Sequence, residues 1–72
     1  MSLFPQTIEK LARMGANIEI TESTTLFPQT LENIVRICVA TGGHVTISSH
    51  GIFPQTLERL VQIGGNNITI RV

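Results

Sequence analysis

The sequence predicts an α/β fold of three tandem helix–strand repeats, with a short parallel sheet and the helices on one face. Phe-Pro-Gln-Thr, followed by Ile or Leu and then Glu, occurs three times, beginning at Phe4, Phe27 and Phe53. Each copy leads into an amphipathic stretch, a glycine-containing break and a short alternating segment. This is the pattern of a helix followed by a half-buried strand. The 72 residues are therefore expected to form one domain of three units, approximately 3–24, 25–50 and 51–72.

Each helix is expected to begin at the proline of the repeated motif. Proline is favoured at the first helical position because its missing N–H would have no partner there. This places the three phenylalanines at the N-caps, where we expect them to be buried. The apolar residue before each phenylalanine can pack against the residue after the threonine, as a hydrophobic staple. The expected staple pairs are Leu3–Ile8, Leu26–Leu31 and Ile52–Leu57.

One apolar stripe follows each helix start at spacings of three and four, so each helix should bury one side. The stripes are Ile8-Leu11-Ala12, Leu31-Ile34-Val35-Cys38 and Leu57-Leu60-Val61-Ile63. Glu9, Glu32 and Glu58 lie at equivalent positions outside the stripes and are expected to be solvated. Glycines are expected to end the helices in the left-handed conformation. The second helix should be the longest, since 14 residues separate its proline from the glycine, against 10 in the other units.

Alternation in the closing segments predicts strands at 18–21, 45–48 and 68–72, each with one apolar and one polar face. The apolar face comprises Ile18, Ile20, Val45, Ile47, Ile68, Ile70 and Val72. The polar face comprises Glu19, Thr21, Thr46, Ser48, Thr69 and Arg71. A parallel sheet covered on both faces would instead show continuous apolar runs. We therefore expect the polar face to be open and predict it as an interface for a partner or a second sheet.

Size and charge favour self-association. A core of this size supplies only about 3–5 kcal/mol, and Cys38, as the single cysteine, allows no internal disulfide. The formal net charge is zero and only 14% of residues are charged, so little repulsion separates copies. The outer strands of a three-stranded sheet also offer unpaired edges. The predicted function is that of a small self-associating binding or scaffold protein, a homo-oligomer that also binds a protein partner.

A second prediction places a ligand at the helix starts. Parallel sheets bind ligands beyond the carboxyl ends of their strands, and free N–H groups at helix N-termini attract anions. The candidate residues are Gln6, Thr7, Gln29, Thr30, Gln55, Thr56 and His50. Binding of an anionic small ligand or a peptide carboxylate is thus the alternative function. The simpler interpretation is that Pro-Gln-Thr is a helix-starting segment copied by duplication.

Other function classes have less support. Cys38 lies on an apolar stripe near a helix C-terminus, which favours a core position over a reactive thiol. Glu22 and His50 supply too few ligands for a metal, and phosphate-loop and nucleophile-elbow motifs are missing, so neither catalysis nor a cofactor is expected. Five basic residues are balanced by five glutamates, which disfavours a nucleic-acid-binding regulator. The lack of a signal peptide or a long apolar run predicts a cytoplasmic protein without membrane contact.

Overall fold

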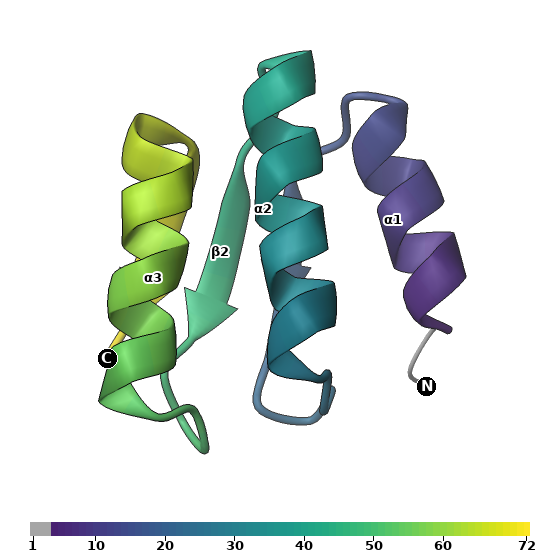
Figure 1. Ribbon diagram of the computed structural model, residues 1–72. Helices are drawn as coiled ribbons and strands as arrows, with labels where there is room; N and C mark the ends of the chain where they lie inside the picture. Colours follow the sequence, from purple (N-terminus) through teal and green to yellow (C-terminus); the bar gives the residue numbers. More distant parts are fainter. Residues whose placement is uncertain (1–3) are drawn as a thin grey trace.

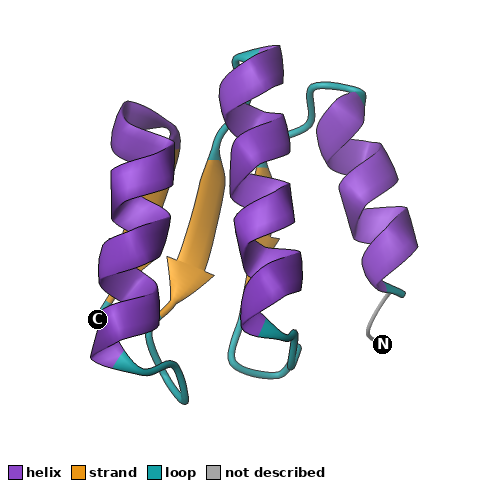
Figure 2. Ribbon diagram, viewed as in Figure 1, coloured by secondary structure: helices purple, strands orange, loops and turns teal. Residues whose placement is uncertain are grey.

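The computed structural model describes residues 4–72 and confirms the α/β fold. The elements are α1 (Pro5–Arg13), β1 (Ile18–Ile20), α2 (Pro28–Thr41), β2 (Val45–Ser48), α3 (Pro54–Gly64), the 3-10 turn η1 (Gly65–Asn67) and β3 (Ile68–Arg71). The strands form one parallel sheet in the order β1-β2-β3. The three helices lie side by side on the same face of that sheet (Figure 1 and Figure 2). Helices and strands thus form two layers in which each unit lies beside the next.

The register of the strands preserves the repeat. Ile18, Val45 and Ile68 form one row across the sheet, and Ile20, Ile47 and Ile70 form another. These rows face the helices, because all six residues lie in the core or pack against it. Sequence neighbours are also spatial neighbours, so each unit makes most of its contacts with the units next to it.

The core is centred on the middle unit. Ile34, Val35 and Cys38 of α2 and Val45 and Ile47 of β2 are completely buried. Most residues of the predicted stripes lie in or against the core. The exceptions are Leu11 and Leu57, which are half-buried outside it, and Val61, of which 45% is exposed. The expectation that Val72 extends the apolar face of the last strand is wrong. This residue follows the end of β3 and is fully exposed.

The predicted helix starts are confirmed. Pro5, Pro28 and Pro54 are the first helical residues, and the preceding phenylalanines occupy the N-caps with extended backbones. Leu26 and Ile52, which precede the phenylalanine in two of the predicted staple pairs, pack against the core. The Leu3–Ile8 staple includes a residue outside the described range.

Left-handed glycines end two of the three helices, as predicted. In α2, the longest helix, Gly42 has φ 75° and ψ 13°. In α1, Gly15 follows the cap residue Met14 with φ 90°, and its N–H donates to the Ala12 carbonyl at 2.9 Å.

In α3 the prediction is wrong, because Gly64 continues the helix and Gly65 has φ 55° with ψ −119°. Gly64 has a packing role instead, since a Cβ atom on it would lie 2.7 Å from Ile68 Cγ2 and 2.9 Å from Val35 Cγ1. Its missing side chain lets α3 approach both the sheet and α2.

Candidate functional site

The first candidate surface is the sheet face turned away from the helices. Along each strand the polar residues alternate with the buried ones and so lie on the opposite face. Glu19, Thr46 and Thr69 form one row across the sheet, and Ser48 lies opposite Arg71. Thr21, which was predicted to join this set, follows the end of β1 and is exposed.

Side chains on this face bind one another. Arg71 Nη1 donates a hydrogen bond to Glu19 Oε2 at 2.8 Å, so an ion pair joins β3 to β1 across the central strand. His44 Nε2 and Thr69 Oγ1 are hydrogen-bonded at 2.6 Å. Exposed pairs of this kind contribute little stability. These bonds do pair the polar side chains of the sheet face with one another. The face can therefore stay exposed to water without a second sheet packed on it.

The second candidate surface is the end of the molecule at which all three helices begin. The strands end there too, because every unit runs up its helix and back down its strand (Figure 1). Within the described residues, no side chain caps the N-terminus of a helix. Gln6, Gln29 and Gln55 are exposed, and Gln29 Nε2 donates to Asn33 Oδ1 at 3.1 Å along its own helix.

The predicted threonines at this end differ in exposure: Thr7 is exposed, whereas Thr30 and Thr56 are half-buried. His50 is exposed in the turn between β2 and α3. The seven predicted ligand residues are therefore spread along the whole end of the molecule.

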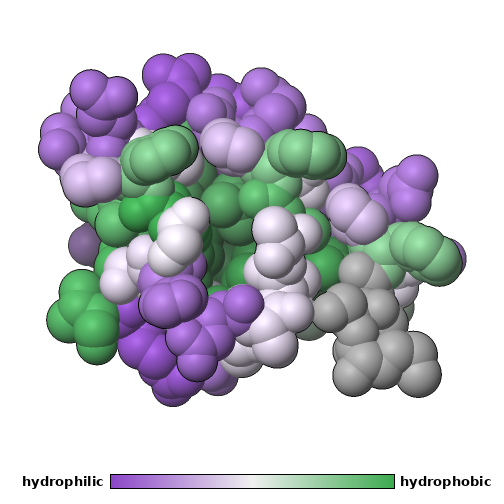
Figure 3. All heavy atoms as spheres, turned by 90° about the horizontal axis from the view of Figure 1, so that it is seen from below, coloured by the Kyte–Doolittle hydropathy of each residue, from purple (hydrophilic) through white to green (hydrophobic). Residues whose placement is uncertain are grey.

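Three exposed phenylalanines mark this end, and here the sequence-based expectation is wrong. Phe4, Phe27 and Phe53 are 77%, 80% and 78% exposed. In an extended backbone, consecutive side chains point to opposite sides. Because Leu26 and Ile52 point into the core, the phenylalanines that follow them point outward. Figure 3 looks onto this end and shows separate apolar groups set among polar residues.

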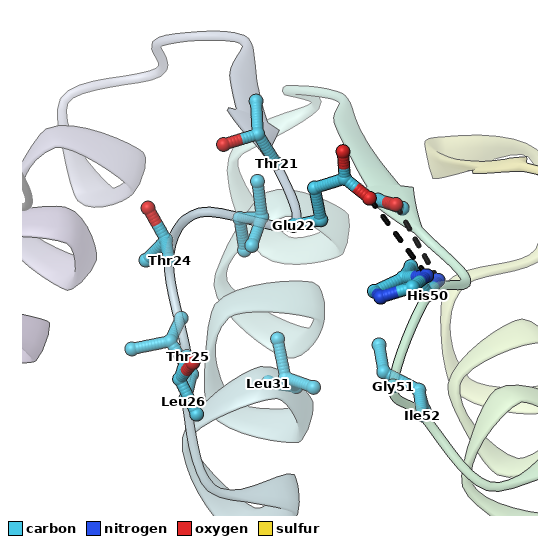
Figure 4. Close-up of a pocket in the computed structure, with 11 residues that line it drawn as sticks. Thr21, Glu22, Thr24, Thr25, Leu26, Leu31, His50, Gly51 and Ile52 are labelled. Carbon is cyan, nitrogen blue, oxygen red and sulfur yellow. Dashed lines mark hydrogen bonds and ion pairs between the residues drawn. The ribbon is translucent and has the colours of Figure 1, made fainter.

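A hollow of about 170 Å³ lies beyond the carboxyl ends of β1 and β2. The Glu22 carboxylate and the His50 imidazole point toward each other beside it (Figure 4), with Oε2 and Nδ1 3.8 Å apart. Leu26, Leu31 and Ile52 supply apolar walls. His50 is the only predicted ligand residue among those lining it. The hollow is smaller than the roughly 300 Å³ of typical small-molecule pockets, and Glu22 disfavours an anion.

A more open hollow adjoins the first at the ends of β2 and β3. Ser48, Ser49, His50 and Arg71 contribute to its lining, together with Thr21, Glu22 and Val72. It brings an arginine, a histidine and two hydroxyl groups to the place where open α/β sheets bind ligands. The signal for these residues was their position directly at strand ends, and of the four only Ser49 was missing from the predicted sites.

Reactive groups are sparse among residues 4–72. Cys38 is completely buried, and burial raises the pKa of its thiol above the ordinary value of 9.0. The thiol is therefore protonated at neutral pH and is a poor nucleophile. Within the same residues, no group of three His, Cys, Asp or Glu side chains could hold a metal ion.

Glu32 departs from the prediction that it is solvated. It is largely buried, and its carboxylate accepts hydrogen bonds from Arg59 Nε at 2.9 Å and Arg36 Nη2 at 3.3 Å. Arg59 belongs to the following unit, so this contact ties α2 to α3. Glu9, by contrast, pairs with Arg13 of its own helix at 3.4 Å. Among the described residues Glu58, at the equivalent position in α3, has no ion pair.

The outer side of α3, which faces away from α2, is partly exposed, whereas the equivalent sides of α1 and α2 are buried. Ala12, Val35 and Val61 occupy equivalent positions in the three units. Ala12 in α1 and Val35 in α2 are 0% exposed, and each helix packs against the next. Among residues 4–72 a helix packs beside α3 on one side only, and Val61 on the other side is partly exposed.

In the part of the chain that the structure describes, no helix is long and apolar enough to cross a membrane. Comparisons of the chain with known protein families, curated proteins and solved structures find no match.

Proposed function

We propose that this chain is a self-associating scaffold protein whose copies bind one another at the ends of the stack of units. The partial exposure of Val61 carries the proposal. Its counterparts Ala12 and Val35 are completely buried in helices that pack against the helix of the next unit. An apolar side chain kept at a unit–unit contact position gains free energy when another packing surface covers it.

The edges of the sheet support the same proposal. With the order β1-β2-β3, each outer strand has one edge to which no strand is paired among the described residues. Such edges carry unpaired N–H and C=O groups that a further strand can satisfy. Neither Ile18–Ile20 nor Ile68–Arg71 contains a proline, and each contains a single charged residue, so little opposes pairing.

The charge distribution favours a protein partner over a nucleic acid. Four of the five basic residues form ion pairs with glutamates: Arg13, Arg36, Arg59 and Arg71. Phosphate binding depends on cations that are free to replace counterions. The four arginines are already paired with glutamates, so fewer free cations remain to bind phosphate.

The proposal is tested by sedimentation velocity and by light scattering from low micromolar to millimolar concentration. We expect the weight-average mass to rise above the 7.9 kDa of one chain as the concentration rises. Val61→Asp should shift this rise to higher concentration, because it places a charge on the exposed apolar position. Thr46→Lys on the open sheet face serves as the control. A mass of one chain throughout the range would refute self-association.

An anionic small ligand is the second candidate, because Ser48, Ser49, His50 and Arg71 converge on one hollow. Glu22, which lines the same hollow, and the Arg71–Glu19 ion pair both oppose it, so it ranks below self-association. Titration with inorganic phosphate, followed by NMR, separates the two parts of this end. Shifts of the amides of residues 48–50 and 71 would support the hollow. Shifts of residues 5–7, 28–30 and 54–56 would support the helix starts. Phosphate that shifts neither set would refute anion binding.

A further inference from the structure

The contact between α2 and α3 provides a template for the contact between copies. On α2, Glu32 is hydrogen-bonded to Arg59, and Val35 lies close to Gly64 of α3. Leu31, one turn before Val35 on the same side of the helix, is buried as well. From α3 the contact uses Arg59, whose Nε donates to Glu32 Oε2 at 2.9 Å, and Leu60, which is completely buried. An apolar contact flanked by one ion pair thus joins the two units.

The outer side of α3 presents the same residue types that α2 contributes to this template. Leu57, Glu58 and Val61 of α3 are equivalent to Leu31, Glu32 and Val35 of α2. Leu57 is half-buried, and Glu58 and Val61 are exposed. The side of α3 that faces away from α2 therefore repeats the surface to which α3 itself binds. A shallow apolar hollow is lined by Leu57, Glu58, Val61 and Gln62.

The outer side of α1 presents residues equivalent to those that α3 contributes. Lys10, Leu11 and Met14 of α1 are equivalent to Arg59, Leu60 and Ile63 of α3. Leu60 is completely buried, but Leu11 is only half-buried and 74% of Met14 is exposed. Lys10 forms no ion pair with another residue in the range 4–72.

We infer that copies of this chain stack head to tail, with α1 and β1 of one copy packed against α3 and β3 of the next. Lys10 then lies beside Glu58 of the next copy, as Arg59 lies beside Glu32 within one chain. This inference rests on the proposed self-association and specifies its geometry.

The strand register extends in the same way. Ile18 and Ile68 both pair with Val45 in the central strand, and Ile20 and Ile70 both pair with Ile47. Continuing this register places Ile18 of one copy opposite Ile68 of the next, and Ile20 opposite Ile70 of the next. The apolar faces of the two sheets then join on the side that the helices cover. The contact uses different surfaces of the two partners, so it leaves both ends of the assembly open to growth unless the stack closes into a ring.

Charge reversal provides the test. Lys10→Glu places two glutamates at the contact and Glu58→Lys places two lysines there, so each variant alone should associate about tenfold more weakly than the original chain. In an equimolar mixture the two variants can alternate along the stack. Every contact then brings opposite charges together, so the mixture should recover the original association. Glu22→Lys, in the loop between β1 and α2, changes the net charge by the same amount as Glu58→Lys. It is the control for that variant and should associate normally. Circular dichroism checks that each variant is folded, and sedimentation velocity measures association.

The outcomes separate this inference from the proposed function. If the original chain stays monomeric, both are refuted. If it associates but Lys10→Glu and Glu58→Lys have no effect, head-to-tail stacking is refuted and self-association stands. An effect of Glu58→Lys alone would indicate a symmetric α3–α3 contact and would also refute it. As a second variant, Val61→Asp should weaken association. Mixing it with the Glu58→Lys chain should not restore association, because both substitutions lie on the outer side of α3.

Discussion

The same substitution at two equivalent positions measures how much a neighbouring unit contributes. Val35→Ala and Val61→Ala each remove two methyl groups from a helix, which corresponds to about 1.6 kcal/mol for full burial. Both gain roughly 0.6 kcal/mol because alanine is the better helix former. Val35 is completely buried and should leave a cavity, whereas Val61 is 45% exposed and should not.

These terms predict different losses of stability. For Val35→Ala we expect a loss of about 1.5–2.5 kcal/mol once a cavity cost is added to the transfer term. For Val61→Ala, about half of the transfer term remains, and the net loss is about 0.3 kcal/mol. The difference depends on the cover that α3 provides, since the chemical change is the same.

Urea unfolding at low micromolar concentration, followed by circular dichroism, measures both values. At this size, a loss of about 2 kcal/mol lowers Tm by roughly 8–16 °C, which a thermal scan resolves. Equal losses at the two positions in the monomer would refute the argument from burial. Repeating the measurement at high concentration adds a second test, because stacking would cover Val61 and increase the cost of Val61→Ala.

Three further predictions concern single sites. Gly64→Ala should destabilise the fold by about 1 kcal/mol in urea unfolding, because overpacking against Val35 and Ile68 outweighs the gain in helix propensity; a more stable variant would contradict this close approach. Because burial raises the pKa of Cys38 in the folded state, its contribution to stability should be complete below pH 9.0 and lost as the pH rises through the folded-state pKa. Urea midpoints measured on both sides of pH 9.0 should show this loss, and Cys38→Ala should lack it. Phe27→Ser should change the free energy of unfolding by less than about 0.5 kcal/mol, and a loss several times larger would show that the ring packs in the fold.

The units and their order of elements could be predicted because their signals are local. Proline at the first helical position, the apolar stripes and strict alternation in the strands each depend on residues within one unit. Gly42 likewise ends α2 in the conformation that its position suggested. The helices on one face followed from the same alternation, since only one side of each strand is apolar.

The errors concern neighbours in space. Whether Glu32 is buried depends on Arg59, which lies 27 residues away, and nothing within the second unit indicates which helix packs beside it. The exposure of Val61 depends in the same way on the neighbours of α3, which among residues 4–72 has a helix on one side only. The phenylalanines were different, because a signal existed: a staple residue pointing inward forces the next residue outward.

The exposed phenylalanines have a consequence for valency. Each unit presents one such ring at the same end of the molecule, so a single chain carries three equivalent exposed rings. A flexible partner with several matching pockets would bind the second and third rings at an effective concentration set by its linkers, and its avidity would exceed the affinity for one ring. A head-to-tail stack would add three rings with every copy. The binding strength of this end would then depend on the length of the assembly.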